Sequence, residues 1–158
     1  MLLYLVRHAI AAEPSPLRPD DLRPLTPAGE RKFAAAVRGA ARLGWRFDRC
    51  YHSPKLRAVQ TAALLRPLVR GPLQALPDLA RPPDVELLAH LEGERVALVG
   101  HQPFLGALIA WLTTGENGRG ESFALKKGGF AVLTGAPRPG AMALRALVPP
   151  KLLRRLGT

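Results

Sequence analysis

Three short segments of this sequence combine histidine and arginine in a way that suits phosphoryl transfer. They are Arg7-His8, the stretch Ser53 to Thr61 with Arg57 inside it, and Gly100 to Pro103 with His101. A neutral imidazole can attack phosphorus and hold the phosphoryl group covalently until water removes it. Arginine forks hold phosphate oxygens better than lysine does, and a second histidine can donate a hydrogen bond to the same group. Together these side chains predict chemistry on a phosphorylated substrate.

The elements that must position these segments can be read from the surrounding sequence. Leu2 to Val6 is continuously apolar, which is typical of a strand buried on both faces of a parallel sheet. Thr26-Pro27 is a capping residue followed by a proline, and it predicts a helix over Pro27–Leu43 that stops at Gly44. The other predicted strands are Phe47–His52, Leu73–Leu76, Arg95–Val99, Ser122–Leu125, Phe130–Thr134 and Met142–Val148. The other predicted helices are Ser53–Leu65, Asp84–Leu91 and Pro103–Thr113, followed by a basic amphipathic turn over Lys151–Leu156.

This alternation of strands and helices predicts an α/β fold, a three-layer α/β/α sandwich with a mostly parallel sheet. Right-handed crossovers bring the carboxyl ends of parallel strands to one edge, where open sheets bind ligands. His8, Arg57 and His101 all follow predicted strands, so we expect them to meet at that edge. Ser53-Pro54 would add the free N–H groups of a helix N-terminus to the same anion. Crowding by cations should lower the pKa of His8 and keep its imidazole neutral and nucleophilic.

Length and composition are those of one domain over residues 1–158. No apolar run approaches the roughly 20 residues of a membrane-spanning helix. The apolar N-terminal run stops before Arg7 and has no basic region or cleavage site, so we expect no secretory signal. Cys50 is the single cysteine, which excludes an internal disulfide and fits a reducing cytoplasm. No carboxylate–histidine cluster has the spacing of metal ligands, so we expect neither a metal nor a cofactor.

The chain carries a strong positive charge. Lysine and arginine number 23 against 12 aspartate and glutamate residues, a formal net charge of +11. Such an excess favours anionic partners, among them nucleic acid, acidic lipid and phosphorylated substrates. The basic residues are spread along the whole chain and aromatic residues make up only 6% of it, so the sequence lacks the aromatic-studded basic face of a nucleic-acid binder. We therefore expect a phosphorylated partner, no nucleic acid and no membrane, and we favour a monomer.

The motifs at the strand ends resemble those of the histidine phosphatase superfamily, also called phosphoglycerate-mutase-like. They are Leu-Val-Arg-His ending at His8, Ser-Pro-x-x-Arg-x-x-Gln-Thr over residues 53–61, and Gly-His-x-Pro over residues 100–103. The compact length and Arg23-Pro24-Leu25-Thr26 are similar to the phosphohistidine phosphatase SixA branch, and the resemblance extends from Met1 to about Leu112. It implies a phosphoglycerate-mutase-like fold, His8 as the phospho-accepting nucleophile, and a phosphate pocket made by Arg7, Arg57 and His101.

Two positions depart from the family pattern. The family usually has Arg-His-Gly where this chain has Ala9, so the local backbone can differ there. Members of the superfamily often place an acidic proton donor after the third strand, and Asp78 is the candidate acid in that region. Asp84 and Glu86 are the other acidic residues nearby. The alternative for Asp78 is a helix-capping or surface aspartate.

The proton donor determines which phosphorus bond such a site can break. An alkoxide leaving group benefits from a positioned acid, worth about 10²–10⁴-fold, whereas the imidazole of phosphohistidine can take a proton from solvent. A short chain has little room for a cap, so an open edge could admit a phosphorylated protein side chain. The proline-rich stretch Ala11–Leu25 is the one lid-like element, and on it we favour Arg23 over Arg18 for contacting substrate.

The leading hypothesis is a metal-independent phosphatase that forms a covalent phosphohistidine on His8 and removes phosphate from phosphohistidine in a protein. The first alternative is a small-molecule phosphomonoesterase or mutase of the same superfamily. The second is a nucleic-acid- or polyphosphate-binding domain, which predicts strongly salt-dependent binding that survives His8→Ala.

Overall fold

The strands form one six-stranded sheet. The computed structural model describes residues 1–158, and its strands lie in the order β3-β2-β4-β1-β5-β6. Their bounds are Leu2–Arg7 for β1, Arg49–His52 for β2, Leu73–Ala75 for β3, Arg95–Gly100 for β4, Phe130–Gly135 for β5 and Met142–Val148 for β6. β3, β2, β4 and β1 are parallel, whereas β5 is antiparallel to β1 and β6 is antiparallel to β5. The sheet is therefore mixed, and β1, β2 and β4, which precede the three sequence motifs, belong to its parallel part.

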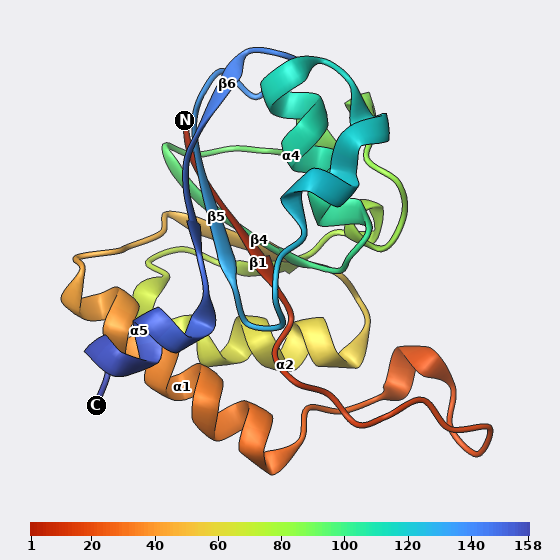
Figure 1. The fold of residues 1–158 in the computed structure, drawn as a ribbon, viewed down its shortest axis with the longest axis vertical. Helices are drawn as coiled ribbons and strands as arrows, with labels where there is room; N and C mark the ends of the chain where they lie inside the picture. Colours follow the sequence, from red (N-terminus) through yellow and green to blue (C-terminus); the bar gives the residue numbers. More distant parts are fainter.

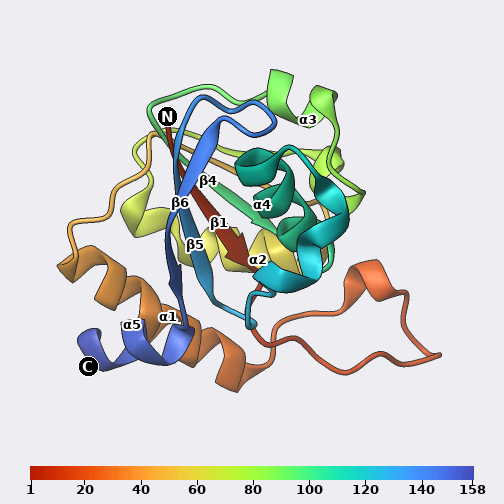
Figure 2. The same ribbon diagram turned by 45° about the horizontal axis from the view of Figure 1, so that its top comes forward.

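Helices cover both faces of this sheet, as Figures 1 and 2 show together. They are α1 (Pro27–Arg42), α2 (Leu56–Leu64), α3 (Val85–Ala89), α4 (Phe104–Thr114) and α5 (Pro150–Leu156). The central strand β1 is buried between the two helical layers. Tyr4 and Val6 belong to the core beneath α1, α2 and α5, whereas Leu3 and Leu5 belong to the core beneath α3 and α4. The predicted three-layer sandwich is confirmed.

The ends of α1 follow the sequence signals. Thr26 Oγ1 accepts a hydrogen bond from Gly29 N at 2.9 Å, and Pro27 occupies the first turn. Gly44 follows the helix with a φ of 76°, a conformation that favours glycine. Gly29 also lets the helix approach the loop after β1, because a Cβ here would overlap the carbonyl of Ile10. The first turn of α1 is thus packed beside the residues that follow β1.

Several predicted elements differ from the structure. The strand predicted at Phe47–His52 begins at Arg49, and the helix predicted at Asp84–Leu91 spans Val85–Ala89. Ser122–Leu125 is not a strand, because a 3-10 helix over Asn117–Phe123 packs on α4, where Gly120 lies too close to the backbone of Ala107 for any side chain. α2 begins at Leu56 rather than at Ser53, because Ser53 N still donates to the Val99 carbonyl and so extends the pairing of β2 with β4 by one residue.

None of the helices has both the length and the apolar character needed to cross a membrane.

Gly39 is the contact point between α1 and α5. A Cβ at this position would overlap the carbonyl oxygen of Leu153, so only glycine allows the two helices to pack this closely. We expect Gly39→Ala to lower the free energy of unfolding by roughly 1–3 kcal/mol through overpacking, although alanine favours a helix interior by about 1 kcal/mol. Urea denaturation measures the change. Gly118→Ala is the control, because nothing lies within 4 Å of its Cβ position; an unchanged Gly39→Ala protein would contradict this packing.

Candidate active site

The register of the parallel strands brings the three sequence segments to one edge. Arg7 pairs with Gly100 across β1 and β4, and His52 pairs with Val99 across β2 and β4. His8, Ser53 and His101 are therefore the next residues along three neighbouring strands. His8 N donates to the Gly100 carbonyl at 3.0 Å, which extends the pairing by one residue. The rings of His8 and His101 have their centroids 5.2 Å apart, so the two histidines meet as the strand order predicted.

The imidazole of His8 is buried and held in one tautomer. Its Nδ1 lies 2.7 Å from the carbonyl oxygen of Ala9. A carbonyl only accepts, so Nδ1 carries the proton and Nε2 keeps its lone pair in the neutral ring. Burial lowers the pKa of His8 to about 4, and the charges of Arg57 and Arg7 act in the same direction, against the hydrogen bond to Ala9. His8 is therefore a neutral imidazole with a free Nε2 at neutral pH.

The second histidine is oriented by Ser53. His101 Nε2 lies 2.7 Å from Ser53 Oγ, and the same oxygen accepts a hydrogen bond from Lys55 N at 3.3 Å. Since Lys55 N is a donor, the hydroxyl proton is free to point at His101 Nε2, and in that tautomer the ring proton is on Nδ1. Burial, followed by the neighbouring His8 and the charge of Arg57, lowers the pKa of His101 to about 3. His101 is also neutral, with Nδ1 as its remaining donor.

Three buried donors in this cluster lack a protein partner: Arg7 Nε, Arg57 Nε and His101 Nδ1. Unpartnered buried donors are rare in folded proteins, and three beside one imidazole require an explanation. Both guanidinium groups are fastened elsewhere, since Arg7 Nη1 donates to the Leu125 carbonyl at 2.8 Å and Arg57 Nη1 donates to the Asp20 carbonyl at 2.8 Å. These three groups, here called the cradle, could together hold a tetrahedral anion beside the ring of His8.

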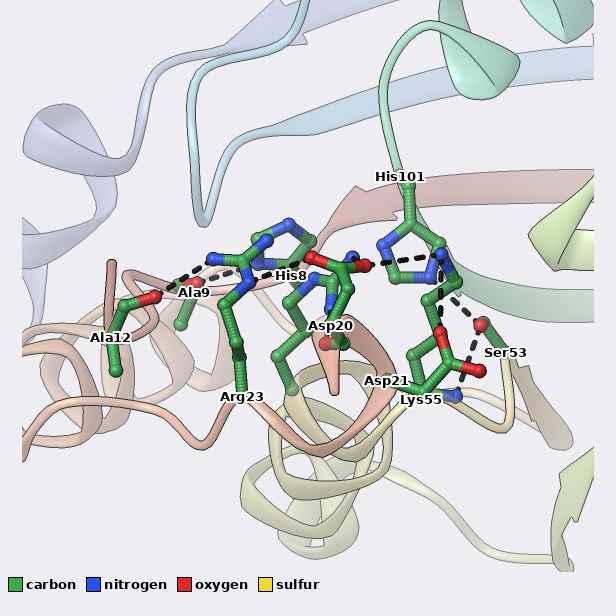
Figure 3. A network of polar contacts seen from close by, with 10 residues as sticks. His8, Ala9, Ala12, Asp20, Asp21, Arg23, Ser53, Lys55 and His101 are labelled. Carbon is green, nitrogen blue, oxygen red and sulfur yellow. Dashed lines mark hydrogen bonds and ion pairs between the residues drawn. The ribbon is translucent and has the colours of Figure 1, made fainter. Parts of the chain in front are cut away.

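The stretch of residues 11–25, here called the strap, brings further charges to this cradle (Figure 3). Arg23 Nε donates to Asp20 Oδ1 at 2.9 Å, and Arg23 Nη1 donates to the Ala12 carbonyl at 2.8 Å. The positive charge of Arg23 also contributes to the lowered pKa of His8. The structure therefore brings Arg23 to the cluster, with its guanidinium already bonded within the strap. Asp20 is an additional member of the site that sequence reasoning missed.

The motif over residues 53–61 places three polar side chains on α2, and each makes hydrogen bonds within the protein. Arg57, Gln60 and Thr61 are spaced by three and four residues, which puts them on one face of the helix. Gln60 Oε1 accepts a hydrogen bond from Leu25 N at 2.7 Å and fastens the strap. Thr61 Oγ1 accepts from Ala9 N at 3.0 Å and donates to the Arg57 carbonyl at 2.7 Å. Sequence reasoning identified this motif but assigned no role to Gln60 or Thr61.

Ala9 and Ser53 differ from what the sequence led us to expect. No residue other than glycine has a positive φ in the structure, so Ala9 needs no unusual backbone and is buried without strain. Ser53 is fully buried and does not cap α2, whose N-cap is Lys55. Its hydroxyl contacts His101, so Ser53 reaches the site through that imidazole rather than through a helix N-terminus.

The ion pairs of Asp78 join it to Arg81 and His90 and not to a residue of the cluster. Its carboxylate is paired with Arg81, and the hydrogen bond from Arg81 lowers the pKa of Asp78. Arg81 also pairs with Asp84 at 2.9 Å and with Glu86 at 3.0 Å. The three carboxylates are close enough to resemble a metal site, but their shared cation is this guanidinium. Asp78 is thus a buried, ionised carboxylate paired with Arg81, and it is neither a helix cap nor a surface residue.

A cavity of about 490 Å³ opens beside Arg7. It lies between the start of α4 and the 3-10 helix that packs on it. Its walls are formed by Arg7, Gln102, Pro103, Ala107, Asn117, Gly118, Gly120, Glu121 and Ala124. Mostly polar and small residues therefore surround the space next to the cradle.

Solved structures of similar fold include histidine phosphatases. A structure of the protein histidine phosphatase SixA complexed with tungstate is 26% identical, covers 97% of this chain and 99% of that chain, and has a TM-score of 0.81. A protein assigned as a phosphohistidine phosphatase SixA from Agrobacterium tumefaciens is 25% identical over 93% of this chain and 96% of that chain, with a TM-score of 0.76. One assigned as an alpha-ribazole-5'-P phosphatase from Escherichia coli, 19% identical over 94% of this chain and 96% of that chain with a TM-score of 0.74, shares the fold.

Sequence comparison agrees with the structural likeness. The profile of the histidine phosphatase superfamily (branch 1) matches residues 3–80, the part that holds Arg7, His8 and Arg57. An uncharacterised protein of Picosynechococcus sp. is 36% identical over 154 residues, which cover 92% of this chain and 90% of that protein. The chain therefore belongs to the histidine phosphatase superfamily, and its structural likeness is to the SixA phosphohistidine phosphatases within it.

Proposed function

We propose that this chain forms a covalent phosphohistidine on His8 and removes phosphate from phosphohistidine in a protein. The observation that carries the proposal is the set of three unpartnered buried donors, Arg7 Nε, Arg57 Nε and His101 Nδ1, beside the neutral imidazole of His8. A phosphoryl group has the charge and the oxygens to satisfy all three. The likeness to a SixA protein that binds tungstate, another tetrahedral oxyanion, supports this assignment.

Two displacements at phosphorus make up the proposed reaction. Nε2 of His8 attacks phosphorus, so an N–P bond forms while the N–P bond of the substrate breaks. The substrate imidazole, protonated by solvent at its other nitrogen, leaves as a neutral ring. Water then attacks phosphorus, the bond to His8 breaks, the electron pair returns to Nε2 and a proton passes to solvent. Because Arg7, Arg57 and His101 meet the charge on the phosphoryl oxygens throughout, we propose that the reaction needs no metal or cofactor.

The protonation of Asp20, at the cluster, and of Asp78, the acid expected from the sequence, supports cleavage of an N–P bond rather than an ester. The hydrogen bond from Arg23 lowers the pKa of Asp20 to about 2, and Arg81 lowers that of Asp78. Both groups are ionised at neutral pH and hold no proton for an alkoxide leaving group. An imidazole leaving group needs no such acid because solvent protonates it. The proposed substrate class follows from this difference in leaving-group chemistry.

One observation favours a second candidate, a phosphomonoesterase for a small molecule. The cavity of about 490 Å³ beside Arg7 is large enough for a small polar leaving group, and Asn117 and Glu121 line it. The alpha-ribazole-5'-P phosphatase that shares the fold is by its name an enzyme of this kind. This candidate uses the same His8 chemistry and differs only in the group that leaves.

Three substrates separate the two candidates. A protein domain carrying phosphohistidine tests the N–P bond, 3-phosphoglycerate tests an ester with a poor leaving group, and p-nitrophenyl phosphate tests an ester that leaves without help from an acid. We expect kcat/KM to be highest for phosphohistidine and lowest for 3-phosphoglycerate, with at least about 10²-fold between them. His8→Ala protein is the blank, because phosphohistidine also hydrolyses spontaneously. Equal or faster hydrolysis of 3-phosphoglycerate would contradict the protein-directed proposal and support the second candidate.

A further inference from the structure

The strap brings a carboxylate into contact with the arginine of the proposed phosphate cradle. Asp20 Oδ2 accepts a hydrogen bond from Arg57 Nη2 at 3.1 Å, and the backbone oxygen of the same residue accepts from Arg57 Nη1 at 2.8 Å. Lys55 Nζ lies 3.4 Å from Asp20 Oδ2, and Arg23 Nε lies 2.9 Å from Oδ1. Both terminal nitrogens of Arg57 are therefore bonded to residue 20, and three cations surround one carboxylate. Figure 3 shows Arg23 and Lys55 on either side of Asp20.

The position of this carboxylate is at the solvent side of the cluster. The side chain of Arg57 is 6% exposed, whereas that of Asp20 is 51% exposed. The negative charge of Asp20 acts electrostatically on the cradle, because it raises the pKa of His101 against the larger effect of burial. Asp20 itself is ionised at neutral pH, because its pKa is lowered to about 2. A phosphoryl group entering the cradle thus meets one fixed negative charge among the arginines.

We propose that Asp20 is an internal counter-anion that competes with the phosphoryl group for Arg57 and thereby sets the affinity of the site for phosphate. The proposal rests on the proposed function, because the donor in question belongs to the proposed cradle. When a phosphoryl group binds, Arg57 Nη2 exchanges the Asp20 carboxylate for a phosphoryl oxygen. When the product phosphate leaves, the carboxylate takes Arg57 Nη2 again. This exchange favours release of inorganic phosphate, which a hydrolase must not retain.

The fastening of the strap limits this exchange to a side-chain movement. Arg23 Nη1 donates to the Ala12 carbonyl, which joins the two ends of the strap to each other. Leu25 N donates to Gln60 Oε1, which joins the strap to α2. The backbone oxygen of Asp20 keeps its own bond to Arg57 Nη1. After the carboxylate gives up Arg57 Nη2, Arg23 and Lys55 still neutralise it. No opening of the strap is required.

A different role for Asp20 predicts the opposite result. If its carboxylate served to orient Arg57 for phosphate, removing the charge would weaken phosphate binding. If it competes with phosphate, removing the charge strengthens binding, because the cations of the cradle lose a rival anion. The sign of the change in phosphate affinity therefore separates competition from positioning.

Asp20→Asn tests this sign, because asparagine keeps the shape and an acceptor oxygen but removes the charge. The dissociation constants for inorganic phosphate and tungstate are measured by isothermal titration calorimetry at one pH and one ionic strength. We expect Asp20→Asn to bind both anions about tenfold more tightly than wild type, and KM, kcat and the inhibition constant for phosphate to fall together. Asp20→Ala should shift both affinities in the same direction, since the backbone bond of residue 20 to Arg57 remains.

Asp21→Asn is the matched control. It removes the same charge one residue along, where the carboxylate pairs only with Lys55 at 3.5 Å and is 72% exposed, and we expect anion affinities within about twofold of wild type. Asp20 variants that bind phosphate no more tightly than Asp21→Asn overturn the counter-anion role. If wild-type protein binds neither anion and shows no His8-dependent turnover, the proposed function fails as well. Wild-type binding and turnover with unimproved Asp20 variants would overturn the counter-anion role alone.

Discussion

Replacing His8 by alanine is expected to lower turnover by roughly 10⁴-fold or more and to abolish the covalent phosphoenzyme. Nε2 of His8 holds the lone pair that the proposed reaction uses, because Nδ1 donates to the Ala9 carbonyl. We do not expect the other histidine of the pocket to replace it, since Nε2 of His101 is bonded to Ser53 and its Nδ1 is buried. The fold should persist, because the hydrogen bond to Ala9 is the only one that the His8 side chain makes.

The phosphoenzyme is measured directly by mass spectrometry after rapid mixing with substrate and quenching with alkali, which preserves phosphohistidine. Wild-type protein should gain the mass of one phosphoryl group on the peptide that contains His8, and the variant should gain none. His90→Ala is the control, because His90 is exposed and makes no hydrogen bond to the cluster. Circular dichroism confirms that both variants are folded. Near-normal turnover by His8→Ala would refute the mechanism.

Replacing Arg57 by lysine is expected to lower kcat/KM by roughly 10²–10³-fold, the usual effect of losing one donor to a developing oxyanion. The guanidinium is 6% exposed, its Nη1 bonds the backbone of residue 20, and Nε together with the exchanging Nη2 is proposed to meet the phosphoryl group. Lysine keeps the positive charge but has one nitrogen, so it cannot bond the strap and a phosphoryl oxygen along these separate directions. Geometry rather than charge is therefore the expected cause of the loss.

Steady-state kinetics with p-nitrophenyl phosphate measures this effect, and tungstate binding shows whether the anion site itself is weakened. Arg70→Lys makes the same exchange at an exposed arginine whose side chain has no hydrogen bond, and it should leave kcat/KM unchanged. If Arg57→Lys retained the wild-type kcat/KM, the several donors of the Arg57 guanidinium would have no role in catalysis beyond the positive charge.

The contacts of α2 explain why its motif has the spacing that the sequence shows. Arg57, Gln60 and Thr61 share one face of the helix, and that face meets three different segments: Asp20, Leu25 and Ala9. Thr61 holds the backbone of Ala9, whose carbonyl fixes the tautomer of His8. The helix thus positions the nucleophile, the arginine and the strap at once. A change at Thr61 would act on His8 through Ala9 and not through contact with substrate.

The sequence by itself determined most of the helices and strands and the sheet edge where His8 and His101 meet. Leu2 to Val6 is apolar on both faces and can be stable only inside a sheet, and Thr26-Pro27 and Gly44 mark the ends of α1 through local backbone chemistry. Parallel strands have their carboxyl ends on one edge, so the positions of His8 and His101 after two such strands were sufficient to bring them together. These inferences depend on periodicity and on short-range geometry.

Only the tertiary structure decided which polar groups are bonded to which. Asp20 lies 37 residues from Arg57 along the chain, and nothing local to either residue predicts their pairing. The same holds for Ser53 and His101, which are 48 residues apart. It also holds for the 3-10 helix over Asn117–Phe123, whose Gly120 packs against the backbone of α4 where a strand over Ser122–Leu125 was expected. Asp78 was a candidate acid by its place after β3, and only the folded chain shows that Arg81 pairs with it and lowers its pKa. Hydrogen bonds and ion pairs act over a few ångströms and in fixed directions, so they follow from the packed fold and not from the order of residues.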